Sequence, residues 1–167
     1  MPKLYDYAES VEVIAKRILP TYHAELATAR MLYMFVDKAS MKGGRPVLGK
    51  AKKVSGALEF LLEKDFIIEI PSDQWNNLNE NQRIALIDHM LERCTGVEDD
   101  DEDSSTRGSM KWMIREPDVQ EFATILSRHG VWHENLTSFV EVAQRVNIDA
   151  QVQEVVDSDT ETVTVTT

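Results

Sequence analysis

The chain has 167 residues and a mass of 19.0 kDa, with 43% apolar and 28% charged residues. This composition excludes a collagen-like or wholly disordered chain and predicts one globular domain with a sizeable core. No apolar run approaches the roughly 18 residues of a membrane helix, and the N-terminus lacks the basic-then-apolar layout of a signal peptide. The single cysteine, Cys94, has no partner for an internal disulfide. We therefore expect a cytoplasmic protein without a membrane anchor.

The net charge of −11 is concentrated in two segments. Residues 149–167 contain five acidic and no basic residues, and a continuous acidic run precedes Ser104. The run consists of Glu98, Asp99, Asp100, Asp101, Glu102 and Asp103. The rest of the chain is neutral by count, so the basic surface typical of nucleic-acid binding is absent, and we expect no direct binding to nucleic acid.

The N-terminal half alternates between helical and extended patterns. The apolar spacing that ends at Ile18 predicts a helix over 6–19, closed by Pro20. A bulky apolar run predicts a strand over 30–36, and a turn at 42–46 connects it to a strand over 47–54 as a hairpin. The remaining elements of this half are a helix over 58–62 and a strand over 66–70.

The C-terminal half is mainly helical. Asn79 and Gln82 form a capping pair for a helix over 79–94, whose inward side chains include Ile84, Ile87 and Leu91. An acidic, Ser-rich loop over 96–109 is expected to be mobile. The later elements are a strand over 110–114, a helix from Pro117 to Gly130, a helix over 134–146 and a flexible acidic tail over 148–167. This order predicts a single α+β domain over 1–147.

Three separated segments carry a family resemblance. They are residues 64–68 followed by Trp75, residues 82–89, and residues 117–122 continuing to 128–132. In order and spacing, these segments resemble the putative phage metallopeptidase family, a group of small zincin-like proteins. The resemblance covers roughly residues 8–132. It implies a short mixed or antiparallel sheet, an active-site-type helix packed on that sheet, further C-terminal helices, a zinc ion, and location in the cytoplasm of a bacterial host.

The family motif on the central helix is H-E-x-x-H, followed by a carboxylate on a later helix. Two histidines at i and i+4 reach one zinc ion, and the intervening glutamate is the general base. In this chain the first position is His89, the base position is Met90 and the second ligand position is Arg93. The resemblance places the later carboxylate at Glu121. Because Met accepts no proton and Arg repels a divalent cation, we expect no catalytic residue at these positions and no bound zinc.

Several interpretations of these residues remain open. Arg93 can occupy the place of the metal by forming a structural ion pair with Glu121 or Asp118. Alternatively, His89, Glu92 and Glu121 can form a rearranged metal site, because Glu92 lies at i+3 from His89. Asp118 and Glu121 also fit a helix capping box that needs no chemistry.

The tryptophans and the other histidines are assigned structural positions. We expect Trp75, Trp112 and Trp132 in or beside the core. The three histidines outside the motif, His23, His129 and His133, are expected at the surface or at helix ends.

These observations support three functions. The first is a pseudoenzyme that binds a host or phage protein, for example to counter host defence. The second is a rearranged metalloprotein with residual peptidase activity. The third is an acidic mimic of nucleic acid that inhibits a DNA-binding host protein through the acidic run. We expect the first of these functions, with a protein partner and no membrane, and the sequence assigns no oligomeric state.

Overall fold

The computed structural model describes residues 2–120 and 122–146, and it divides into two compact units, residues 1–116 and 117–167. The boundary after Glu116 lies inside the single domain that the sequence predicts over 1–147.

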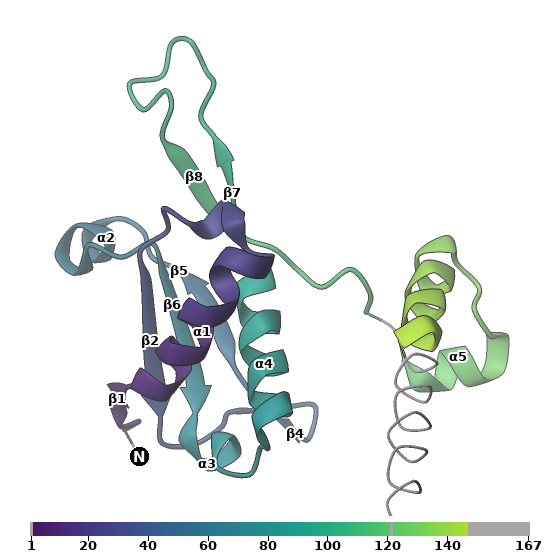
Figure 1. Ribbon diagram of the computed structural model, residues 1–167. Coiled ribbons are helices and arrows are strands. Elements are labelled where there is room, and N and C mark those ends of the chain that lie inside the picture. The colour runs from purple at the N-terminus through teal and green to yellow at the C-terminus, as the bar shows by residue number, and fades with distance from the viewer. Residues whose placement is uncertain (1, 121, 147–167) are drawn as a thin grey trace, which may run out of the picture. The chain divides into compact units, whose positions relative to one another are not determined.

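A mixed four-stranded sheet forms the centre of the first unit (Figure 1). In spatial order it consists of β1 (Tyr5–Tyr7), β2 (Met31–Val36), β6 (Phe66–Pro71) and β5 (Lys50–Lys53). Strands β2 and β6 are parallel, and the other neighbours are antiparallel. The predicted α+β class is confirmed, and the strands predicted over 30–36, 47–54 and 66–70 do share one mixed sheet.

The predicted hairpin between the strands over 30–36 and 47–54, which correspond to β2 and β5, is wrong. Strand β5 pairs with β6, and β2 lies between β1 and β6. The side chains explain this order. Phe66, Ile68 and Ile70 of β6 are fully buried, which favours a central position, whereas β5 has the sequence Lys-Ala-Lys-Lys and tolerates the solvated edge of the sheet.

Two helices cover one face of this sheet. Helix α1 (Glu9–Tyr22) and helix α4 (Glu80–Glu92) lie side by side, and their apolar faces share one core with β6 (Figure 1). Ile87 and Leu91 are fully buried as predicted, while Ile84 is only partly buried. Pro20 lies inside the last turn of α1 instead of ending the helix, which closes where the His23 N–H donates to the Leu19 carbonyl.

Short elements connect the main ones. These are η1 (Ala24–Leu26), β3 (Met41–Lys42), β4 (Arg45–Pro46), α2 (Ala57–Leu62) and α3 (Ser72–Trp75). The Trp75 side chain is buried, and its ring centroid lies 5.9 Å from that of Phe35. The Arg30 guanidinium forms a bidentate ion pair with the buried Asp65, the residue directly before β6.

Helix α4 begins as predicted and ends earlier than predicted. Asn79 and Gln82 form both hydrogen bonds of the capping box. The helix ends at Glu92, and Cys94 begins β7 (Cys94–Glu98), which pairs with β8 (Met110–Ile114). Gly96 lies in β7, and its lack of a side chain leaves room for Trp112, because a Cβ there would lie 2.5 Å from Cε3 of Trp112. Trp112 packs edge-on against Phe66, 5.6 Å between ring centroids, as a core-edge residue.

The second unit contains α5 (Ala123–His129) and a helical stretch over 134–146. Gly130 ends α5 with φ +66°, as predicted. The predicted start at Pro117 is wrong, because α5 begins at Ala123 with Phe122 as its N-cap. The capping-box interpretation of Asp118 and Glu121 stays a prediction, because Glu121 lies outside the described residues. Trp132 is more than half exposed, in contrast to the expected core position.

None of the described helices is both long and apolar enough to cross a membrane. The predicted tail over 148–167 lies outside the described residues.

Candidate functional site

The motif residues of α4 line an open groove of about 480 Å³. His89 and Arg93 lie four residues apart, so both side chains point to the same face of the helix. Apolar side chains supply most of the remaining wall, together with Gln82. The other lining residues are Leu48, Gly49, Leu78, Ala85, Leu86 and Met90. The predicted orientation of His89 and Arg93 toward a cleft is confirmed.

An ion pair fixes Arg93 at the end of this groove. Its Nη2 lies 3.2 and 3.3 Å from the two carboxylate oxygens of Glu116. The backbone supports the same contact, because the Arg115 N–H donates to the Arg93 carbonyl at 2.7 Å. The acidic partner of Arg93 is thus Glu116, which lies two residues after the end of β8. Asp118 belongs to the second unit and Glu121 lies outside the described residues, so a pair with either stays a prediction.

Glu92, the alternative ligand, is engaged elsewhere. Its Oε1 accepts a hydrogen bond from Arg115 Nη1 at 2.6 Å, and its Oε2 lies 3.8 Å from Nδ1 of His23. A carboxylate that already neutralises a guanidinium is a weaker metal ligand. The rearranged site of His89, Glu92 and Glu121 stays a prediction, because Glu121 lies outside the described residues.

His23 lies at a helix end, as the C-cap of α1, which is one of its two predicted positions, but its side chain is buried and not at the surface. The ring is 1% exposed, and its Nε2 lies 2.6 Å from Oδ1 of Asp88. The Nδ1 atom has no hydrogen-bond partner among the described residues, and the Glu25 carboxylate lies 3.7 Å away. The sequence contains no local signal for this pair, because 65 residues separate its members.

The base position of the motif belongs to the core. Met90 is 4% exposed and packs so closely on Gly49 that a Cβ there would lie 2.9 Å from the Met90 sulfur. Cys94 is also buried, and burial raises the pKa of its thiol to about 12, so it stays protonated at neutral pH. Neither sulfur is available as an anionic ligand.

These residues do not fit the zinc ion that the motif implies. Among the described residues, no three His, Cys, Asp or Glu side chains are grouped so that they could hold a metal ion. The three motif positions supply one imidazole, one thioether and one guanidinium, whereas zinc needs three neutral or anionic donors. We therefore derive no chemical step through a metal.

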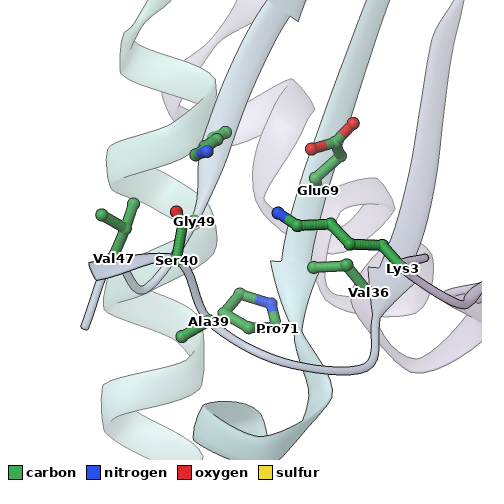
Figure 2. Close-up of a pocket in the computed structure, with 9 residues that line it drawn as sticks. Lys3, Val36, Ala39, Ser40, Val47, Gly49, Glu69 and Pro71 are labelled. Carbon is green, nitrogen blue, oxygen red and sulfur yellow. The ribbon is translucent and has the colours of Figure 1, made fainter. Parts of the chain in front are cut away.

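A second groove continues from the first along β5. It also measures about 480 Å³ and shares Gly49 and Arg93 with the first. Basic side chains of Lys42, Lys50 and Lys52 line it. Figure 2 shows the adjoining hollow at the other side of Gly49, where Lys3 and Glu69 extend over Val36 and Pro71.

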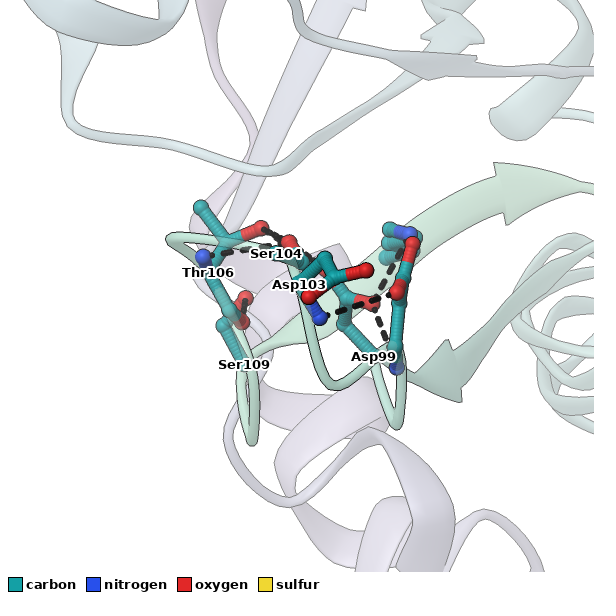
Figure 3. A network of polar contacts seen from close by, with 7 residues as sticks. Asp99, Asp103, Ser104, Thr106 and Ser109 are labelled. Carbon is teal, nitrogen blue, oxygen red and sulfur yellow. Dashed lines mark hydrogen bonds and ion pairs between the residues drawn. The ribbon is translucent and has the colours of Figure 1, made fainter.

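The acidic run is partly folded into the β7–β8 hairpin. Residues 96–98 belong to β7, so the connecting segment is shorter than predicted. Asp99 is 2% exposed and accepts hydrogen bonds from the Ser104 and Thr106 hydroxyls, both at 2.7 Å, and its other oxygen lies 3.0 Å from Lys111 Nζ (Figure 3). The Ser104 hydroxyl, followed by Thr106 and Lys111, holds the pKa of Asp99 well below its usual range. The other acidic side chains of the run are exposed. The mobility of this loop stays a prediction.

The fold and the α4 groove define a small zincin-like α+β protein. The chain belongs to the putative phage metallopeptidase family, whose model matches residues 4–156. Comparisons with curated proteins and with solved structures give no match.

Proposed function

We propose that this family member binds a protein partner through the α4 groove without hydrolysing it. The observation that carries the proposal is the ion pair between Arg93 and Glu116 at the second ligand position of the motif. A guanidinium that is held there by a carboxylate opposes a divalent cation, and the neighbouring Met90 offers no base. The fold is retained while the chemistry of the motif is not.

The shape and lining of the groove support binding. It is open and mainly apolar, with His89, Gln82 and Arg93 as polar groups that can orient a bound segment. The acidic-mimic alternative receives less support, because the buried Asp99 is neutralised within its own hairpin by Lys111 of β8.

Two measurements test the loss of chemistry. Elemental analysis after dialysis should find far less than one zinc per chain, and a quenched-fluorescent peptide library with added zinc should show no hydrolysis. A zinc content near one per chain that disappears in His89→Ala would contradict the proposal.

Photo-crosslinking tests the binding surface. A photoreactive amino acid at Ala85, which lines the groove, should capture a discrete protein from bacterial lysate. The same group at the exposed Val13 of α1 is the matched control and should not capture that protein. Identical capture from both positions would show that the groove is not the interface.

A further inference from the structure

Cations gather beside β5, although the chain as a whole carries a charge of −11. Lys52 is paired with Glu69 at 2.5 Å, and Arg93 is paired with Glu116. Lys42 and Lys50 are exposed and have no ion-pair partner within the part of the chain that the structure describes. All four side chains line one groove, so it retains an excess of positive charge after the two carboxylates are counted.

Strand β5 also presents an open edge next to these cations. It is the last strand of the sheet, and among the described residues it forms a ladder with β6 alone. An edge strand has backbone N–H and C=O groups that an extended peptide can pair with, and alternate side chains of that peptide then point to the same face. Carboxylates at every second position of a paired peptide would therefore all point to one face, about 7 Å apart.

We propose that the segment recognised by this protein is an extended acidic peptide, which pairs along the free edge of β5 and places its carboxylates against Lys42 and Lys50. The proposal rests on the proposed function and names the chemical class of its partner. The ammonium groups of Lys42 and Lys50 at one groove favour acidic side chains over neutral ones, and the strand edge favours an extended backbone over a helix.

Binding of synthetic peptides to the full chain tests this inference. The probe is a fluorescent seven-residue peptide that alternates threonine and glutamate, and the comparison peptide has glutamine for each glutamate. We expect the acidic peptide to bind at least about fivefold more tightly, a difference that falls as salt is added. The variant with Lys42→Gln and Lys50→Gln should remove this preference. Lys53→Gln is the matched control, because Lys53 lies on the same strand, is exposed and does not line the groove.

The outcomes separate this inference from the proposed function. Equal binding of the acidic and neutral peptides would overturn the acidic preference while leaving groove binding intact. An equal loss in Lys53→Gln would show a general charge effect and overturn the assignment to this groove. Tighter binding of a single-stranded oligothymidylate of equal charge would overturn the peptide as the occupant. If the Ala85 crosslink is found and neither peptide binds, the proposed function stands and this inference fails.

Discussion

Nε2 of His23 lies 2.6 Å from Oδ1 of Asp88, and this contact joins the end of α1 to the exposed side of the motif helix α4. The imidazole is buried and the carboxylate is half exposed, so Asp88 supplies the hydrogen bond that the ring loses when it leaves water. The residue directly before the motif histidine is therefore structural.

Asp88→Ala should lower the free energy of unfolding by about 1–3 kcal/mol, because it leaves both ring nitrogens of the buried His23 without a partner. Urea denaturation at pH 7 measures this change. Glu25→Ala is the control, since its carboxylate lies 3.7 Å from the ring and is half exposed. A loss in Asp88→Ala no larger than in the control would contradict the structural role of the pair.

The ion pair between Arg30 and Asp65 makes the free energy of unfolding depend on pH in the acidic range. Burial raises the pKa of Asp65, but hydrogen bonds from Arg30 outweigh it, and the net pKa is lowered. A lowered pKa in the folded state gives a stabilisation that is complete above the unfolded value of about 4 and is lost as the pH falls through the folded value. Arg30→Gln should therefore destabilise the protein most at neutral pH and progressively less below about pH 4.

Denaturation curves at pH 7, 5 and 3 test this dependence. Lys52→Gln removes the half-exposed pair with Glu69, and the cost of that variant should be small at neutral pH. A cost of Arg30→Gln that stays constant from pH 7 to pH 3 would contradict the assignment to Asp65.

Met90→Glu should lower the free energy of unfolding by about 2–4 kcal/mol, although it restores the glutamate of the family motif. The reason is that the side chain at this position is 4% exposed and packs against Gly49. Met90→Leu preserves volume and should cost less than about 1.5 kcal/mol. Thermal and urea unfolding of both variants, without metal, make the comparison. Equal stability of Met90→Glu and the parent would show that this side chain is not part of the core.

Asp99 should control access of proteases to the β7–β8 connection. Arg107 is exposed within this segment, and the Gly108 N–H donates to the Asp99 carbonyl at 2.7 Å. Asp99→Ala removes the acceptor for Ser104, Thr106 and Lys111, so trypsin should cleave after Arg107 several times faster. Mass spectrometry of timed digests measures the rate. Asp103→Ala is the matched control from the exposed part of the run, and equally fast cleavage in both variants would show that Asp99 does not order the segment.

The sequence by itself determines the local elements of this protein. Asn79 and Gln82 are three residues apart, and a capping box depends only on that spacing, so the start of α4 is predicted correctly. The strands at 31–36 and 66–71 follow from short apolar runs bounded by turn residues, and Gly130 ends α5 because it adopts a positive φ.

The tertiary structure decides which elements meet. Strand β5 pairs with β6 in the folded chain. Which strand becomes its neighbour depends on the packing of the whole sheet, and the residues of β5 alone do not specify it. The partners of Arg93 and His23 lie 23 and 65 residues away, so only the folded chain brings Glu116 and Asp88 to them. The motif positions can be found from their spacing along one helix. Whether each side chain is buried depends on the packing of α4 against the sheet, which places Met90 in the core and Arg93 at the groove.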